Sequence, residues 1–200
     1  YEQWGVDLLQ RVRGMFTFVI WDKNKQELFG ARDHFGIKPF YYAKMNGTFM
    51  YASEIKSLLR HPDFVKELNA EALKPYMTFQ YPAIGETFFK GVYKLPEGHY
   101  FTYRDGKMDI HRYYDEDFRE GKQKLGELVN SIDQTVCDSV KAHQIADVEV
   151  GSFLSSGVDS SYVAAVARPQ HTYSIGFGKG TYNESQQAGE LAELLKLNNT

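Results

Sequence analysis

The fold of this chain is decided by residues 148–161, VEVGSFLSSGVDSS. The order predicts a buried strand, a tight Ser/Gly loop and the first turn of a helix. Such a loop gathers free backbone N–H groups at the positive end of a helix dipole, where proteins hold phosphate. Asp159 places a carboxylate where an anion is expected, which indicates a divalent cation between the carboxylate and a phosphate. Serine hydroxyls add further donors: Ser155, Ser156, Ser160 and Ser161.

Two common phosphate-binding loops are excluded by the glycine pattern. No lysine follows Gly157, and the long glycine spacing of a Walker loop is absent. Gly157 also stands alone where a dinucleotide fingerprint needs three glycines. A plain Ser/Gly turn, with Ser156 or Asp159 as the helix cap, is the alternative that the loop by itself leaves open.

The residues after the loop predict a βαβ unit. The helix continues through residues 162–167 and ends before Pro169, because the residue that precedes a proline is pushed out of the α region. Residues 171–177 alternate as a strand, and Asn183 begins another helix in which Gln186 closes a capping box. The loop would then lie at the carboxyl end of the first strand, the usual ligand position in a doubly wound sheet.

This loop resembles that of a known family. Residues 155–160 are similar to the pyrophosphate loop of the N-type ATP pyrophosphatases, usually written S-G-G-x-D-S. The longer run 150–161 resembles the version in glutamine-hydrolysing asparagine synthetases. Ser156 stands where that family has its first glycine, a change that costs little where φ is negative and matters where the backbone must be left-handed.

The front of the chain resembles the glutaminase domain of the same family, in the family's order. The matching segments are RGMFTFVIWD (13–22), ARDHFGIKPFYY (31–42), ASEIKSLL (52–59) and LPEGHY (95–100). The resemblance implies an α+β portion of the N-terminal-nucleophile (Ntn) glutaminase type, with stacked antiparallel sheets. The start of an α/β parallel-sheet ATP-pyrophosphatase domain is expected to follow it.

The chain is predicted to divide around residues 115–124, which are charged and aperiodic and are expected to form a linker. Residues 1–114 are the expected glutaminase part, with Asn46-Gly47 and Asp105-Gly106 as two-residue hairpin turns. Residues 125–200 are the expected synthetase part, and they begin with an amphipathic helix over 125–143. Its apolar face carries Leu125, Leu128, Val129, Ile132, Val136 and Val140.

Three local features of the front part also carry predictions. Ser53 is expected to cap a short helix over 54–60, and Asn69 another that begins at Ala70. Arg32-Asp33 is expected to be a local ion pair or a turn cap, with a substrate-binding role as the alternative.

Composition excludes several classes of protein. The 200 residues are 42% apolar and carry a net charge of −3, which gives no basic footprint for nucleic acid. No apolar run has the length of a membrane span. The single cysteine, Cys137, excludes an internal disulfide framework and suits a reducing cytoplasm. The six histidines are scattered, so no zinc site is expected.

The resemblance implies a specific chemistry and set of partners. In this family ATP adenylates the side-chain carboxylate of aspartate, pyrophosphate leaves, and ammonia from glutamine hydrolysis forms asparagine. Asp159 would be the Mg²⁺ ligand, and a homodimer is suggested. Leu154 and Ile175 match positions that contact adenine, with ordinary core packing as the alternative for both. The residues expected to bind ATP are Leu154, Ser155, Ser156, Gly157, Asp159, Ser160 and Ile175.

No residue of this chain is assigned to glutamine hydrolysis. The family's nucleophile is an N-terminal cysteine, whereas the first residue here is Tyr1 and Cys137 lies inside a predicted helix as a half-buried thiol. The chain is therefore expected to be an internal fragment that lacks this nucleophile and the later part of the synthetase site. Two other functions stay open: a carboxylate-adenylating enzyme like the β-lactam synthetases, and a non-catalytic nucleotide-binding module.

Overall fold

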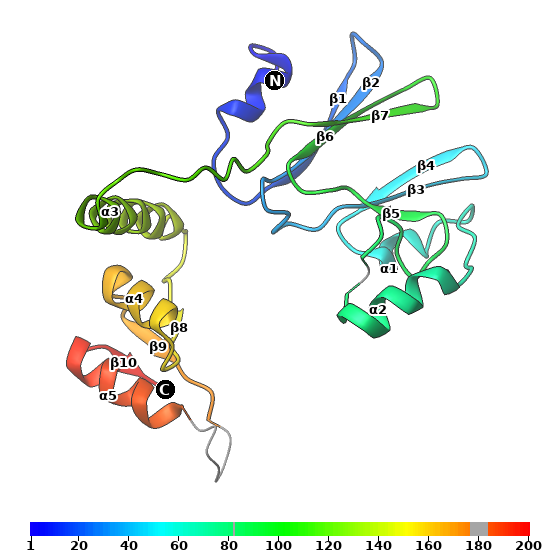
Figure 1. Ribbon diagram of the computed structural model, residues 1–200. Coiled ribbons are helices and arrows are strands. Elements are labelled where there is room, and N and C mark those ends of the chain that lie inside the picture. The colour runs from blue at the N-terminus through cyan, green and yellow to red at the C-terminus, as the bar shows by residue number, and fades with distance from the viewer. Residues whose placement is uncertain (82, 177–183) are drawn as a thin grey trace. The chain divides into compact units, whose positions relative to one another are not determined.

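The computed structural model describes residues 1–81, 83–176 and 184–200 (Figure 1). They form two compact units, Tyr1–Phe118 and Arg119–Thr200. The first unit holds two antiparallel sheets, and the second holds a small parallel sheet with helices.

The first unit contains a four-stranded sheet of order β1-β2-β6-β7 and a three-stranded sheet of order β4-β3-β5. The strands are β1 Thr17–Asp22, β2 Glu27–Arg32, β3 Tyr41–Met45, β4 Thr48–Ala52, β5 Val92–Lys94, β6 His99–Arg104 and β7 Lys107–Arg112. The helices are α1 Ile55–Leu58 and α2 Leu73–Phe79, with 3-10 turns at Gly5–Gln10 and Ala70–Ala72.

The two antiparallel sheets pack face to face through aromatic side chains. Phe101 of β6 is fully buried between them beside Phe40. Phe49 of β4 stacks on Tyr103 of β6, with ring centroids 4.2 Å apart. Stacked rings bury a large apolar area and fix the spacing of the layers. The predicted stack of antiparallel sheets is therefore confirmed.

The outer face of each sheet is covered as well. Phe29 and Ala31 of β2 are buried beneath Leu9 of the first 3-10 turn. On the other sheet, Met50 packs against Leu58 of α1. Because strand residues alternate between the two faces, the apolar strands of this unit bury both their even-numbered and odd-numbered positions.

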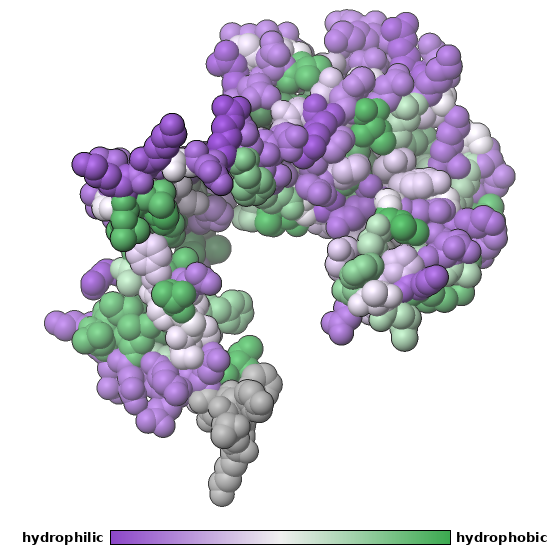
Figure 2. Space-filling view, in the orientation of Figure 1, coloured by the Kyte–Doolittle hydropathy of each residue, from purple (hydrophilic) through white to green (hydrophobic). Residues whose placement is uncertain are grey.

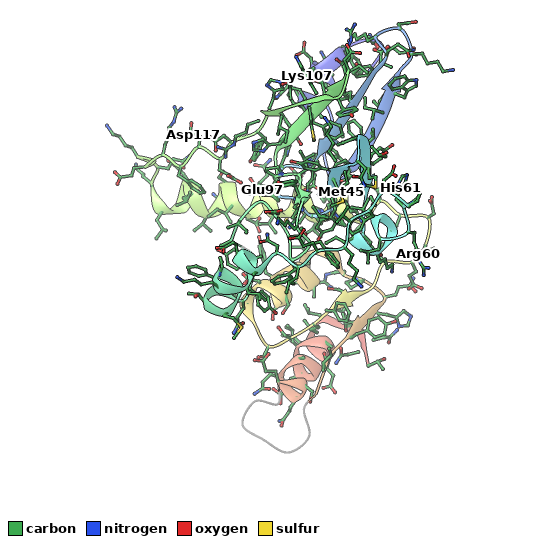
Figure 3. The ribbon with its side chains drawn as sticks, turned by 90° about the vertical axis from the view of Figure 1, so that its right-hand side faces the viewer. Met45, Arg60, His61, Glu97, Lys107 and Asp117 are labelled. Carbon is green, nitrogen blue, oxygen red and sulfur yellow. The ribbon has the colours of Figure 1, made fainter. Side chains whose placement is uncertain are left out.

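Both predicted hairpin turns are confirmed. Asn46 and Gly47 have φ values of 50° and 81° and join β3 to β4, while Asp105 and Gly106 have 51° and 74° and join β6 to β7. Two successive positive φ values define the type I′ turn that matches the twist of a hairpin. Met45 and Lys107, which flank these turns, are labelled in Figure 3.

Gly30 lies where β2 faces the ring of Phe101, and this contact gives a prediction. A Cβ on Gly30 would lie 2.2 Å from the Phe101 ring. That ring is fully buried and cannot move without disturbing its neighbours. Gly30→Ala should therefore lower the free energy of unfolding by about 1–3 kcal/mol. Tryptophan fluorescence during urea unfolding measures this, because Trp4 and Trp21 both belong to the first unit.

Gly85→Ala is the matched control for this test. A Cβ there meets no atom within 4 Å, and the φ of Gly85 is not in the left-handed region. The control should change the free energy of unfolding by less than about 1 kcal/mol. Equal stability of the two variants would contradict the role given to the Gly30–Phe101 contact.

Of the two predicted caps of the first unit, the structure corrects Ser53 and keeps Asn69 as the N-cap of its turn, without a side-chain cap hydrogen bond. Ser53 does not cap α1: its N-cap is Glu54, with no side-chain cap hydrogen bond. Glu54 has an extended backbone, and its carboxylate Oε2 lies 2.5 Å from Lys56 Nζ. The N-cap side chain of α1 therefore forms an ion pair and does not accept a backbone N–H of the helix. Asn69 does flank the turn Ala70–Ala72, but its side chain donates to the carbonyl of Thr87 at 3.1 Å.

The second unit contains a parallel sheet of order β10-β9-β8. Its buried cluster lies between the sheet and two helices and consists of Leu154, Ala164, Ala188 and Ala192. The elements are α3 Leu125–His143, β8 Ser152–Phe153, α4 Val158–Ala167, β9 His171–Tyr173, α5 Ser185–Leu195 and β10 Asn198–Asn199. Together with the antiparallel sheets of the first unit, this arrangement confirms the expected fold class.

The long helix α3 has the predicted bounds, but most of its apolar face is exposed. Val140 is its buried residue, while Leu125 is 76% exposed and Ile132 is 52% exposed. Figure 2 shows this apolar surface in green along α3. Periodicity therefore predicted the helix correctly without showing how much of its face would be covered.

The strand predicted over 171–177 is shorter in the structure. β9 ends at Tyr173 because its neighbours end beside it: Phe153 of β8 pairs with Tyr173, and Asn199 of β10 pairs with Thr172. Residue 177 and the predicted cap Asn183 lie outside the described residues. The predicted stop of α4 is confirmed, since Arg168 has a φ of 43° before Pro169.

Candidate functional site

The loop between β8 and α4 begins in the core and ends in solvent. Leu154 is buried, and its N–H donates to the carbonyl of Tyr173 at 2.9 Å. The chain then turns through exposed residues, and Gly157 is the N-cap of α4, with extended backbone and no side-chain cap hydrogen bond. The alternative in which Ser156 or Asp159 caps the helix is therefore wrong. The positive end of α4 is left open toward solvent.

Serine hydroxyls hold the bend of this loop. The Oγ atoms of Ser155 and Ser160 lie 2.8 Å apart, and the Ser155 N–H donates to Ser160 Oγ at 3.2 Å. The Gly157 N–H donates to Ser155 Oγ, also at 3.2 Å. The hydroxyl of Ser161 donates to the Gly157 carbonyl at 2.7 Å. These contacts shape the loop from both of its ends, and every one of them is accessible to solvent.

The backbone of the loop accepts serine at position 156 without strain. Ser156 is not among the described non-glycine residues with positive φ, and Gly157 itself has a φ of −69°. Neither position needs the left-handed backbone that favours glycine. The departure of this chain from two successive glycines is thus consistent with the loop geometry.

Asp159 lies in the first turn of α4 with an exposed side chain. It makes no hydrogen bond or ion pair with the described residues. A carboxylate in the first turn is favoured by the helix dipole whether or not a cation is present. The described residues contain no group of three or more His, Cys, Asp or Glu side chains that could hold a metal ion. A cation at Asp159 would therefore need phosphate oxygens and water as its other ligands.

A cavity of about 300 Å³ opens beside the loop. Its lining joins the loop to the end of β9, and it consists of Phe153, Leu154, Ser155, Ser160, Tyr173, Ser174, Ile175, Glu184 and Ser185. Four of the predicted site residues meet there: Leu154, Ser155, Ser160 and Ile175. The other three, Ser156, Gly157 and Asp159, lie on the loop and α4 outside the described lining.

The two apolar residues of the predicted site differ in burial. Leu154 is 3% exposed and belongs to the buried cluster of the second unit, so it packs in the core as well as lining the cavity. Ile175 is 69% exposed, so core packing does not explain its position. A large exposed apolar side chain at a cavity is a candidate contact for a flat ring.

Sequence reasoning missed Ser174 as part of this site. Its hydroxyl donates to the Leu154 carbonyl at 2.9 Å, at the point where the loop leaves β8. The only signal in the sequence is a small polar residue in the middle of the strand predicted over residues 171–177. That signal gives no partner, because the contact joins residues 20 positions apart in the chain.

In the first unit, Arg32 and Asp33 form a turn cap and not an ion pair. They are 2% and 1% exposed. The Asp33 carboxylate accepts the N–H groups of Ile37 and Lys38, both at 2.9 Å, and that of Phe35 at 3.2 Å. Burial alone would raise the pKa of Asp33, but these three donors outweigh it and lower the pKa.

Arg32 completes this cap from the other side of the turn. Its guanidinium donates to the carbonyls of Lys38 and Leu95, both at 2.7 Å, and to that of Gly36. Burial lowers the pKa of Arg32. The Tyr113 hydroxyl donates to the Arg32 carbonyl at 2.7 Å, and burial raises the pKa of Tyr113 to about 12. Both charged groups are therefore committed to backbone partners, which leaves the substrate-binding alternative without support.

The remaining sequence expectations concern Cys137 and membranes. Cys137 is a free, half-buried cysteine on α3, as expected. None of the helices within the described residues has the length and apolarity that crossing a membrane requires.

Comparison with known proteins agrees with these two units. Residues 1–114 match the model of the glutamine amidotransferase domain, and residues 131–200 match the model of asparagine synthase. The fold and the loop thus define a class of protein in which an amidotransferase domain precedes an asparagine synthase region. The chain belongs to the glutamine amidotransferase domain family, and its second unit matches the asparagine synthase family.

Two of its curated relatives are named for asparagine synthesis and glutamine hydrolysis. Asparagine synthetase [glutamine-hydrolyzing] 1 of Bacillus subtilis (strain 168) is 39% identical over 100% of this chain and 32% of its own length. The putative asparagine synthetase [glutamine-hydrolyzing] of Mycobacterium tuberculosis (strain H37Rv) is 37% identical over 98% of this chain and 32% of its own. The chain therefore spans about a third of the length of these relatives.

Proposed function

We propose that this chain is part of a ligase that converts aspartate to asparagine through an aspartyl-adenylate, with ammonia supplied by glutamine hydrolysis. The observation that carries the proposal is the loop 154–157, which has an uncapped helix N-terminus and serine donors beside a cavity. The names of the curated relatives support the same reaction. We further propose the boundaries 1–114, 115–124 and 125–200 for the amidotransferase part, the linker and the synthetase part.

The loop would serve the nucleotide through its donors. Backbone N–H groups at the start of α4 and the hydroxyls of Ser155, Ser156 and Ser160 would surround the phosphates. Before any ligand arrives, Ser155 and Ser160 bond to each other at 2.8 Å, so their donors are already gathered in one place. Donors that are fixed in advance need little rearrangement to stabilise the negative charge of departing pyrophosphate.

The cavity would hold the base of the nucleotide. Leu154 and Ile175 lie on its lining, and Ile175 has the exposed apolar side chain that could cover a ring. Gly157 leaves room for the Ser155 hydroxyl inside the bend of the loop, since a Cβ at position 157 would lie 3.3 Å from Ser155 Oγ. The predicted binding set thus divides into a ring-contacting pair and a phosphate-contacting loop.

The residues present fit a magnesium ion only in part, through Asp159. Its carboxylate has no partner among the described residues and sits at the phosphate end of the loop. Mg²⁺ is usually held by one or two carboxylates together with substrate phosphates and water. Such an ion, when bound, would neutralise phosphate charge. Asp159 would hold and orient it.

The amidotransferase part would supply the nitrogen. Cys137, the one cysteine of this chain, lies in a helix of the second unit, so we assign it no part in glutamine hydrolysis. Glutamine, aspartate and ATP are the proposed substrates, with a cytoplasmic location and a homodimer as further expectations from the family.

Exchange of labelled pyrophosphate into ATP tests this function in the protein that carries this chain. We expect exchange that requires both Mg²⁺ and aspartate, because exchange reports reversible adenylation. Exchange with another carboxylate but not with aspartate would favour an enzyme like the β-lactam synthetases. Lack of exchange with every carboxylate tested would indicate a non-catalytic nucleotide-binding module and would contradict the proposal.

A further inference from the structure

We infer that Asn199 is a positioning residue for the loop 154–157 and acts through the hydroxyl of Ser174. The inference rests on the proposed function, since it concerns how the phosphate-holding loop keeps its shape. Asn199 lies on β10, at the opposite edge of the parallel sheet from β8. It is not among the described residues that line the cavity. Its effect on a bound phosphate would therefore be indirect.

The hydroxyls of Thr172, on β9, and of Ser174, directly after β9, both contact the Asn199 side chain. Asn199 Oδ1 lies 3.0 Å from Thr172 Oγ1 and 3.0 Å from Ser174 Oγ, and both hydroxyls can donate to it. Ser174 Oγ also lies 2.9 Å from the Leu154 carbonyl. A hydroxyl has one proton, so Ser174 shares it between Leu154 and Asn199. These two hydrogen bonds therefore link Asn199 on β10 to Leu154, the first residue of the loop, through the Ser174 hydroxyl.

The backbone around these side chains fixes the same corner of the sheet. The N–H of Ser174 donates to the Thr200 carbonyl at 2.8 Å, and the N–H of Thr200 donates to the Thr172 carbonyl at 3.0 Å. Thr172 is fully buried, so its hydroxyl has no access to water and depends on Asn199 Oδ1 and the Asn198 carbonyl at 3.2 Å. Removing the amide would leave this hydroxyl with a single acceptor.

The Ser174 side chain acts at the point where the pairing of β8 with β9 ends. β8 stops at Phe153 and β9 stops at Tyr173, one residue before Leu154 and Ser174 respectively. The Leu154 carbonyl therefore accepts from a side-chain hydroxyl at the place where the loop departs. Binding groups must be held within about 0.5 Å of their working position to be effective. A shift at Leu154 would move the donors of Ser155 and Gly157 that follow it.

Titration of the ¹⁵N-labelled 200-residue chain with pyrophosphate and MgCl₂ tests the inference. The readout is the shift of the amide signals of Ser155, Ser156 and Gly157 as pyrophosphate is added, which gives the Kd at the loop. A role of β10 in stability alone would leave this Kd unchanged in the folded chain. We expect Asn199→Leu to raise the Kd for pyrophosphate about tenfold, the effect of one lost hydrogen bond to the loop. Asn198→Leu is the matched control, because Asn198 is exposed and neighbouring strand residues point to opposite faces.

The outcomes separate this inference from the proposed function. If the loop amides of the unchanged chain do not respond to pyrophosphate, the proposed function fails. If they respond and Asn199→Leu leaves the Kd unchanged, the inference alone fails. It also fails if Asn198→Leu weakens binding equally, since the effect would then belong to β10 as a whole.

Ser174→Ala covers the case in which Asn199→Leu unfolds the second unit. It removes the shared hydroxyl while Thr172 keeps its bond to Asn199. We expect a similar rise of about tenfold in the Kd for pyrophosphate. In the double variant Asn199→Leu/Ser174→Ala the two losses of affinity should not add, because both changes act through the one proton of the Ser174 hydroxyl. Wild-type affinity in Ser174→Ala would overturn the inference.

Discussion

Replacement of Asp159 by asparagine should lower pyrophosphate exchange into ATP by about 10²–10³-fold, the size of effect typical of losing one charge-stabilising group. The substitution keeps the shape of the side chain and removes its charge. Because Asp159 has no partner among the described residues, no hydrogen bond within them is lost. Stability should change little, by about 0.5 kcal/mol from the helix dipole. Exchange at saturating aspartate and Mg²⁺ is the measurement.

Asp138→Asn is the control for this experiment. Asp138 is an exposed acid on α3 in the same unit, outside the loop. It should leave exchange unchanged, and glutamine hydrolysis should persist in both variants. Should Asp159→Asn retain the full exchange rate, the carboxylate would serve only the helix dipole, and the magnesium assignment would be wrong.

The second large effect is expected at Arg32. Arg32→Met should lower the free energy of unfolding of the first unit by about 3–5 kcal/mol. The substitution removes the donor of the buried Leu95 carbonyl and one donor each from the part-buried bonds to the carbonyls of Lys38 and Gly36. It also removes the positive charge of Arg32, which helps to lower the pKa of the buried Asp33 carboxylate. Urea unfolding followed by the fluorescence of Trp4 and Trp21 measures the loss in this unit.

Arg104→Met provides the comparison. Arg104 ends β6 with its side chain 58% exposed, beside Asp105 at 3.5 Å. An exposed pair of this kind contributes about 0–1 kcal/mol, so the control should unfold almost as the unchanged chain does. A loss at Arg32 no larger than that at Arg104 would mean that the turn 33–38 holds its shape without the guanidinium.

Short-range patterns in the sequence were reliable guides. The Asn-Gly and Asp-Gly pairs predicted both hairpins, since two successive positive φ values are easiest for those residues. Periodicity predicted the bounds of α3, and Pro169 predicted the end of α4. Each of these signals acts within a few residues of its own position, so no distant contact could override it.

Capping was less predictable, because a side chain that is able to cap a helix can bond to a distant partner instead. Asn69 donates to the Thr87 carbonyl, 18 residues away, and leaves its helical turn without a side-chain cap. Ser155 and Ser160 bond to each other across the loop. The candidate caps at Ser156 and Asp159 were wrong for a different reason: the N-cap of α4 is Gly157, which has no side chain.

The sequence by itself determined the two hairpins and the succession of strand, serine-rich loop and helix in the second unit, because those depend on local backbone preference and alternation of apolar residues. The class of fold followed from the resemblance of its motifs to a known family. The tertiary structure alone decided that Arg32 and Asp33 serve the backbone of one turn, and that Asn199 reaches Ser174 and the start of the loop. Arg32 meets Leu95 63 residues away, and Asn199 meets Ser174 25 residues away. The first contact joins segments that belong to the two different sheets of the first unit, and the second follows from the pairing of β10 with β9. Both need segments distant in the chain to become neighbours in space.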